Sequence, residues 1–196
     1  MCIRDSNSTI RTAVAAWLAD ATAAQATYGH ISTWATGGVT DMAYLFCGID
    51  CFCRDRLDLY PDCWCGDCNT AAASFNEDIG AWDTSGVMSM GYMFHDASAF
   101  NQDISGWAVH SVTDMYFMFT YASAFNQDLG WCVDDGVDLS YALSGTQCES
   151  TSCGIGNMAL LRCGSSMGDS RFEPPSPLGS RTRRPPRRRT ATSRRG

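Results

Sequence analysis

The heptapeptide Ala97-Ser-Ala-Phe-Asn-Gln-Asp103 occurs a second time at residues 122–128, 25 residues further along the chain. The similarity extends beyond the two copies, because Phe75, Phe100 and Phe125 each begin a unit with apolar residues at matching positions. A period of this length is typical of repeat architectures, in which one unit cannot bury its apolar face alone and is covered by its neighbours. The chain is therefore predicted to form a stack of repeats.

The matching apolar positions define a predicted repeat core. It consists of Phe75, Ile79, Trp82, Val87, Met90, Phe94, Phe100, Ile104, Trp107, Val112, Met115, Phe119, Phe125, Leu129 and Trp131. An earlier, partial copy spans residues 31–46, so the sequence predicts about four coils, the first separated from the others by an insertion.

The spacing of apolar residues changes within each coil. Phe100, Ile104 and Trp107 frame a short extended stretch, whereas Val112, Met115, Met118 and Phe119 recur at helical spacing, with Ser111 or Thr113 as N-cap. Extended stretches of successive coils would lie about 4.8 Å apart, as in a parallel sheet. These features predict an α/β repeat solenoid of about four coils, each with a short parallel strand and a helical turn.

The pattern AFNQDISGW at residues 99–107, followed by SVTDMYFMF at residues 111–119, resembles the repeat of BspA-like bacterial surface proteins. That family is also described as a mycoplasma domain of unknown function, and related copies occur in marine microalgae. The resemblance covers roughly residues 31–46 and 75–154. It implies a distant, leucine-rich-repeat-like fold, cell-surface display and adhesion, and it brings no catalytic residues. It does not account for an insertion at residues 47–70.

The ends of the chain differ from the repeats. Residues 1–6, Met-Cys-Ile-Arg-Asp-Ser, resemble the translation of a sequencing adapter, which would leave the true N-terminus missing and the chain a fragment. Residues 7–30 are predicted to form a helical N-terminal cap. Its helix would begin at Ser8 or Thr9, continue to Ala26 and end at Tyr28-Gly29, with one apolar face formed by Ile10, Val14, Trp17 and Leu18.

Beyond the first partial repeat at 31–46 come the Cys-rich insertion at 47–70 and the repeats at 71–154, which end in a Cys-stapled coil. Residues 155–196 form an Arg/Pro-rich tail that is predicted to be disordered. Three interpretations of this tail stay open. It is a basic arm for nucleic acid or anionic polysaccharide, a cell-wall or linker segment, or an out-of-frame translation of GC-rich sequence.

Charge is distributed unevenly along the chain. Nine of the 14 basic residues lie in 171–196 beside a single acid, whereas the other 170 residues carry 20 acids and five arginines. We expect such an acidic body to avoid nucleic acid and anionic membranes. No run of 18 or more apolar residues is present, so no membrane span is expected in this sequence. No signal peptide is visible.

Ten cysteines remain once Cys2 is assigned to the adapter-like start. They fall into one cluster of six and one of four: Cys47, Cys51, Cys53, Cys63, Cys65, Cys68, and Cys132, Cys148, Cys153, Cys163. Even clusters favour disulfides and an oxidising compartment. Two alternatives stay open. Thiolates among the six cysteines of the insertion could hold zinc, or the cysteines are free thiols or belong to a mistranslated insert.

Other chemistry-bearing residues are interpreted as structural. His30, His95 and His110 are expected to be solvated, since no nucleophile or oxyanion context accompanies them. The recurring Asn76, Asn101 and Asn126 would align between coils. Stacking of Asp78, Asp103 and Asp128 could bind calcium, but a structural role is favoured. The recurring Trp34, Trp82, Trp107 and Trp131 are assigned to the core rather than to a sugar-binding ladder.

The sequence therefore predicts no catalytic, cofactor-binding or metal-binding residue, and no enzyme. The favoured function is a cell-surface or secreted repeat module that mediates interaction with a protein or glycan, or adhesion. Specificity would reside in residues that differ between copies, such as Ala108, His110 and Tyr116. The alternative is an intracellular scaffold or metal-binding regulator that uses the Cys-rich insertion and the basic tail. The ligand and the oligomeric state are not predicted.

Overall fold

The computed structural model describes residues 6–49 and 68–157. The chain divides into two compact units, Met1–Ser165 and Ser166–Gly196, and the second lies outside the described residues. Most of the adapter-like start, residues 50–67 of the Cys-rich insertion and residues 158–196 of the tail also lie outside them. The predictions made for those segments are therefore not addressed by the structure.

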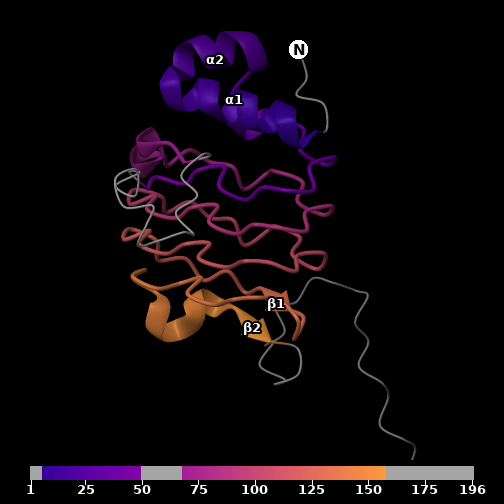
Figure 1. Cartoon of the computed structure of the whole chain (residues 1–196), viewed down its shortest axis with the longest axis vertical. Coiled ribbons are helices and arrows are strands. Elements are labelled where there is room, and N and C mark those ends of the chain that lie inside the picture. The colour runs from indigo at the N-terminus through magenta and orange to yellow at the C-terminus, as the bar shows by residue number, and fades with distance from the viewer. Residues whose placement is uncertain (1–5, 50–67, 158–196) are drawn as a thin grey trace, which may run out of the picture. The chain divides into compact units, whose positions relative to one another are not determined.

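Two helices occupy the N-terminal region, α1 (Asn7–Ala19) and α2 (Ala21–Tyr28) (Figure 1). The predicted cap residues Ser8 and Thr9 lie inside α1, because the side chain of Ser6 accepts the hydrogen bond from the N–H of Thr9. The predicted single helix is interrupted at Asp20, whose backbone N–H donates to Ala16 while its side chain accepts from Ala23. One aspartate thus ends the first helix and begins the second.

The repeats form four layers, which we define as layer 1 (31–48), layer 2 (75–96), layer 3 (100–121) and layer 4 (125–144). Figure 1 shows them as successive lines of chain running from purple to orange. The regular elements in this region are short. They are the 3-10 helices η1 (Ile31–Thr33), η3 (Thr70–Ser74) and η4 (Glu149–Gly154), and the strands β1 (Cys132–Val133) and β2 (Gly156–Asn157), which pair in parallel.

Each layer is joined to the next by a row of four backbone hydrogen bonds, 2.7–3.1 Å long. We call the donors inter-layer amides. In layer 3 they donate to carbonyl oxygens of layer 4 from Asp138 to Ser144 at every second residue. The inter-layer amides are Met42, Tyr44, Phe46 and Gly48 in layer 1, Met90, Tyr92, Phe94 and Asp96 in layer 2, and Met115, Phe117, Phe119 and Tyr121 in layer 3.

The amides that alternate with the inter-layer amides form hydrogen bonds within their own layer. In layer 3, Met118 and Thr120 donate to carbonyls three residues back, and the N–H of Tyr116 donates to the carboxylate of Asp114. Phe117 has a φ of 55°, and the equivalent Tyr44, Tyr92 and Tyr141 have φ of 63°, 57° and 57°. A left-handed residue inside each segment prevents a right-handed helix from continuing, so each layer alternates between turns and bonds to its neighbour.

The predicted α/β repeat solenoid, with a leucine-rich-repeat-like strand and helical turn in each coil, is therefore wrong. In residues 6–49 and 68–157 the strands are limited to β1 and β2, with two residues each, and the layers otherwise share isolated parallel bridges at Asp41, Ser89, Asp114 and Asp138. The helical spacing of Val112, Met115 and Phe119 arises from consecutive turns. These turns bury the same positions as a helix, but every second amide bonds to another layer.

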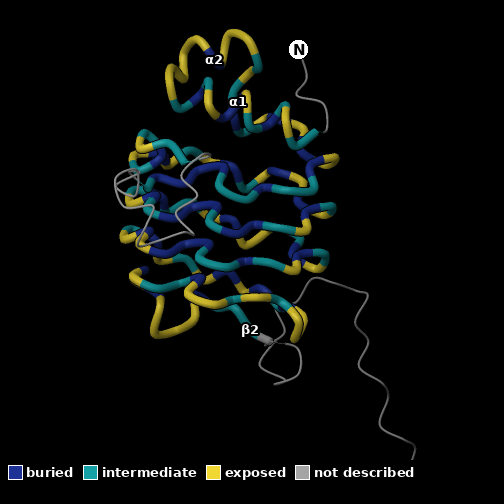
Figure 2. Tube along the Cα trace, viewed as in Figure 1, coloured by how far each residue is buried: buried dark blue, intermediate teal, exposed yellow. Residues whose placement is uncertain are grey.

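Figure 2 shows much of the chain in the layers as buried. Aromatic side chains fill the space inside the layers. Phe46, Phe94 and Phe119 stack with ring centroids 5.4–5.5 Å apart, and Phe75, Phe100 and Phe125 stack at 6.0 Å. The tryptophans form a third column, in which Trp34, Trp82, Trp107 and Trp131 follow one another at 6.1–6.4 Å. Every residue assigned to the repeat core is at most 4% exposed.

The three equivalent asparagines form a ladder between layers. The side-chain oxygen of Asn76 accepts from the N–H of Asn101 at 2.9 Å, and that of Asn101 accepts from the N–H of Asn126 at 2.9 Å. Gln127 also donates to Asn101, through its side-chain nitrogen. Asn101 therefore links its own layer to both neighbours.

One tryptophan of the column, Trp131, lacks the indole hydrogen bond that the others make. The indole Nε1 atoms of Trp82 and Trp107 donate to the carbonyls of Ile31 and Ile79 in the preceding layers. The unit in layer 4 is one residue shorter, with a single residue between Leu129 and Trp131. Among the described residues, Trp131 Nε1 is the one buried side-chain polar atom without a hydrogen-bond partner. The shortened spacing coincides with the loss of this bond.

We predict that Asn101→Ala lowers the free energy of unfolding by about 1 kcal/mol, because the N–H of Asn126 loses its acceptor. Asn101→Asp is the matched control, since a carboxylate keeps an acceptor at the same position, and it should cost less. Urea unfolding of both variants tests this. Equal losses for the two variants would argue against the ladder.

We also predict that Trp107→Phe is more destabilising than Trp131→Phe by about 1–3 kcal/mol. Both substitutions remove the same volume, but the first breaks a buried hydrogen bond to Ile79 and the second removes a buried donor that has no acceptor. Parallel thermal or chemical unfolding of the two variants provides the measurement. The reverse order would contradict this assignment.

Candidate interaction surface

The left-handed turns place aromatic rings along one edge of the layers. We define the aromatic edge as Tyr116, Phe117, Tyr121 and Tyr141. Tyr121 and Tyr141 are 60% and 62% exposed, whereas Tyr116 and Phe117 are half-buried. Phe117 stacks on Tyr92 at 5.2 Å and lies 4.9 Å from Tyr141. The backbone conformation that joins the layers thus also produces a row of rings at the surface.

His95 lies beneath this edge and is not solvated, contrary to the sequence-based prediction. It is 7% exposed, and its ring lies 5.7 Å from that of Phe117 and 5.9 Å from that of Tyr121. Its Nδ1 is 3.0 Å from Oδ2 of Asp96. Burial lowers the pKa of His95 below its ordinary value, and the carboxylate of Asp96 opposes part of that effect.

Several aspartates stabilise turns. Side-chain and backbone hydrogen bonds from Ser85, Ser105 and Ser140 lower the pKa of Asp83, Asp103 and Asp138, respectively. Asp78 accepts from the N–H of Gly80. In the described part of the chain, no three histidine, cysteine or acidic side chains come together in an arrangement that could hold a metal ion.

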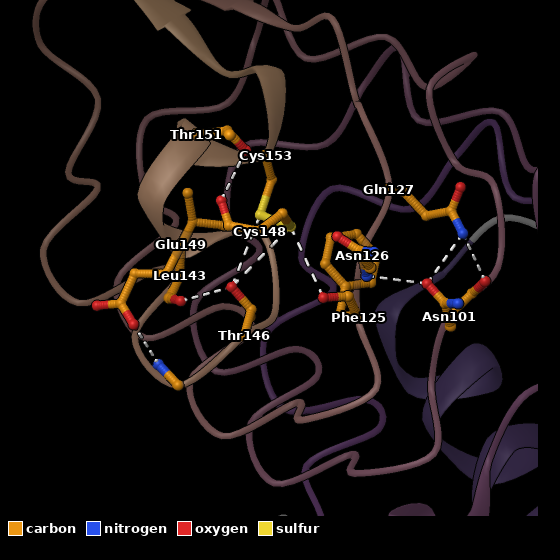
Figure 3. The surroundings of a disulfide bond; sticks show 11 residues. Asn101, Phe125, Asn126, Gln127, Leu143, Thr146, Cys148, Glu149, Thr151 and Cys153 are labelled. Atoms are coloured by element: carbon orange, nitrogen blue, oxygen red, sulfur yellow. Dashed lines mark hydrogen bonds between the residues drawn. A yellow bond between two sulfur atoms is a disulfide. The ribbon is translucent and has the colours of Figure 1, made fainter.

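Disulfides occur at both cysteine clusters. Cys47 is bonded to Cys68, and Cys148 to Cys153 (Figure 3); Cys132 is disulfide-bonded as well. Cys68 is thus not a free thiolate for the alternative zinc site. The remaining predicted disulfide cysteines, Cys51, Cys53, Cys63, Cys65 and Cys163, lie outside the described residues.

The Cys148–Cys153 bond closes a short loop beneath the last layer. Both cysteines are buried, and Cys148 Sγ lies 3.7 Å from the carbonyl oxygen of Phe125. The Thr146 hydroxyl donates to the carbonyl of Leu143, while the carboxylate of Glu149 accepts from the N–H of Gly145 (Figure 3). The disulfide therefore closes η4 on itself, and η4 contacts layer 4 through Cys148 near Phe125 and through the carbonyl of Cys153, which accepts from the N–H of Leu129.

The residues proposed for contact from the sequence are distributed unevenly. His110 is exposed, Ala108 and Tyr116 are half-buried, and only Tyr116 belongs to the aromatic edge. Sequence reasoning missed Tyr121 and Tyr141. The signal for Tyr141 was available, because an aromatic residue recurs at Tyr92, Phe117 and Tyr141 with the period of the repeat.

No helix in residues 6–49 and 68–157 combines the length and apolar character required to cross a bilayer.

The buried state of His95 predicts a pH dependence of stability. Because its pKa is lowered in the folded chain, the unfolded chain binds more protons as pH falls below the ordinary value of 6.5. Stability should be full above that pH and decrease below it. Urea unfolding between pH 7.5 and 5.5 should show that His95→Gln reduces this dependence.

Two further variants sharpen that measurement. Asp96→Asn should make the dependence steeper, because it removes the carboxylate that opposes the shift, and asparagine tolerates the left-handed φ of 55° at this position. His110→Gln removes an exposed imidazole and serves as the control. An unchanged slope in His95→Gln would rule out the proposed linkage.

One family matches the chain. Residues 15–59 and 67–153 match the family described as "Mycoplasma protein of unknown function, DUF285". The match includes all four layers and much of the N-terminal helical region. No curated protein and no solved structure shows a significant match to the chain. Because the matched residues make up more than half of the sequence, the chain belongs to the DUF285 family.

Proposed function

We propose that the chain is a non-enzymatic module, secreted or displayed at a cell surface, that binds a protein or a glycan through its aromatic edge. The observation that carries the proposal is the pair of disulfides, Cys47–Cys68 and Cys148–Cys153, at opposite ends of the layers. Disulfides persist in oxidising compartments and are rare in the cytosol. The resemblance of the repeat to BspA-like surface proteins supports the same location.

The aromatic edge supports an interaction role. Exposed tyrosines have an apolar ring and a polar hydroxyl, and they lose little conformational entropy on binding, so they are frequent at interfaces. Tyr121 and Tyr141 combine this chemistry with hydrogen-bonded backbone, because the N–H of Tyr121 donates to the carbonyl of Ser144 and the carbonyl of Tyr141 accepts from the N–H of Ser144. Rigid presentation reduces the entropy lost when a partner binds.

The aspartates offer further support for a role without catalysis. The carboxylates of Asp83, Asp103 and Asp138 each accept a hydrogen bond from the N–H of a serine within their own turn. Bonds of this kind hold the pKa of these carboxyls low, whereas a general acid or base needs a pKa near the working pH.

We predict that antibodies against the folded chain label intact cells of its source without permeabilisation, and that beads coated with the full chain bind the same surface. Tyr121→Ala should reduce bead binding about tenfold, since it removes an exposed ring of the aromatic edge. Protease or glycosidase treatment of the target surface then distinguishes a protein ligand from a glycan.

Met88→Ala is the matched control, because Met88 is 53% exposed but lies outside the aromatic edge. Two results would contradict the proposal. Labelling that requires permeabilisation would place the chain inside the cell, and equal losses for Tyr121→Ala and Met88→Ala would remove the aromatic edge from the interaction.

A further inference from the structure

Layer 4 is the last of the four layers, and its positions that match the inter-layer amides have no acceptor among the described residues. The equivalent positions are Leu139, Tyr141 and Leu143 in layer 4, and Gly145, which directly follows it. Gly145 donates to the carboxylate of Glu149 at 3.0 Å. The N–H groups of Leu139, Tyr141 and Leu143 have no hydrogen-bond partner in the part of the chain that the structure describes. The amides between them do make their turn bonds, from Ala142 to Leu139 and from Ser144 to Tyr141.

A groove lies beside these donors. It has a volume of about 580 Å³. From layer 4 it is lined by Leu139 and residues 141–144, and from the segment that follows by Glu149, residues 151–152 and residues 154–156. The segment that follows already pairs with part of layer 4. The N–H of Leu129 donates to Cys153, and β2 pairs in parallel with β1. A fifth layer thus begins beneath residues 129–133, and the structure describes none of it beneath residues 139–143.

The ring of Tyr141 adds a second, independent feature. In the column of left-handed aromatics, Tyr92 is covered by Phe117, and Phe117 by Tyr141. Tyr141 is 62% exposed, and the described residues place no further ring of this column against it. The same position therefore offers unpaired donors, an open aromatic face and an apolar wall that includes Leu139 and Leu143.

We propose that this groove is a binding site for a peptide segment that carries the repeat pattern of this chain and forms the same turns. Donors at every second residue of layer 4 match the carbonyls at every second residue of such a segment, as they do between layers 3 and 4, so that binding adds a segment to an exposed edge. In layers 1 to 3, amides at the same positions donate hydrogen bonds to the following layer. An aromatic residue in the added segment would pack on Tyr141 as Tyr141 packs on Phe117.

A folded second copy of the chain does not fit this role. The opposite end of its stack is covered by α1, where Arg11 donates to the carbonyl of Ala43 and pairs with Asp41. The side-chain oxygen of Asn7 accepts from the N–H groups of Thr40 and Asp41. The occupant is therefore a segment with the repeat pattern that is not already bonded into a folded stack. This inference goes beyond the proposed function and stands without it, since it does not depend on where the chain is located.

The test uses the full chain and a fluorescent peptide with the sequence of residues 136–146. In the folded chain, carbonyls of this segment accept the hydrogen bonds from the inter-layer amides of layer 3. Binding is followed by anisotropy and amide exchange by NMR. We expect the amides of Leu139, Tyr141 and Leu143 to exchange rapidly in the free chain and to become protected when the peptide is added. A scrambled peptide should not bind.

Tyr141→Asn should weaken peptide binding about tenfold, because it removes the aromatic face while asparagine tolerates the left-handed backbone. Met88→Ala, which leaves the groove intact, should bind as the wild type does, and thermal unfolding checks that both variants fold. Four results would overturn the inference: no binding at millimolar peptide, binding without protection of the three amides, protection already present in the free chain, or equal binding by Tyr141→Asn. Self-association of the intact chain through these amides would assign the groove to a second copy instead.

Discussion

The backbone hydrogen bond between equivalent residues of neighbouring layers is the interaction on which the rest of the structure depends. Each donor and its acceptor lie 23 or 24 residues apart in layers 2 to 4, so every such bond aligns one repeat on the next. Alignment brings each phenylalanine onto its equivalent in the adjacent layer. The aromatic columns, the asparagine ladder and the tryptophan column all follow from this single register.

Half of the amides are used inside a layer, and this division explains the unusual local structure. A helix would direct every amide along its own axis, and a strand would direct them all toward neighbours. Here, turns and inter-layer bonds alternate, which requires left-handed backbone at Tyr44, Tyr92, Phe117 and Tyr141. Such backbone is costly for residues other than glycine, and packing against the neighbouring layers maintains it.

The repeat period and the buried positions could be predicted from the sequence because apolar residues recur wherever a repeat contacts its neighbour. The conformation of the backbone between these positions could not be predicted. Val112, Met115 and Phe119 have the spacing of a helix, yet consecutive turns bury the same side chains, and periodicity alone does not distinguish them. Burial of His95 was equally hidden, because the residues that cover it, Phe117 and Tyr121, belong to the next layer. The open edge of layer 4 depends on bonds that only coordinates show.

The shortened unit at Leu129–Trp131 has a consequence for how such a chain can change over time. Because the layers are joined by main-chain hydrogen bonds and by buried aromatic columns, substitutions of other surface residues leave the register intact. A change in the number of residues per unit disturbs the register. In layer 4, the omission of a single residue accompanies the loss of an acceptor for the indole of Trp131. Duplication or loss of whole units should therefore be tolerated more readily than small insertions, and unit length should be preserved more strictly than side-chain identity.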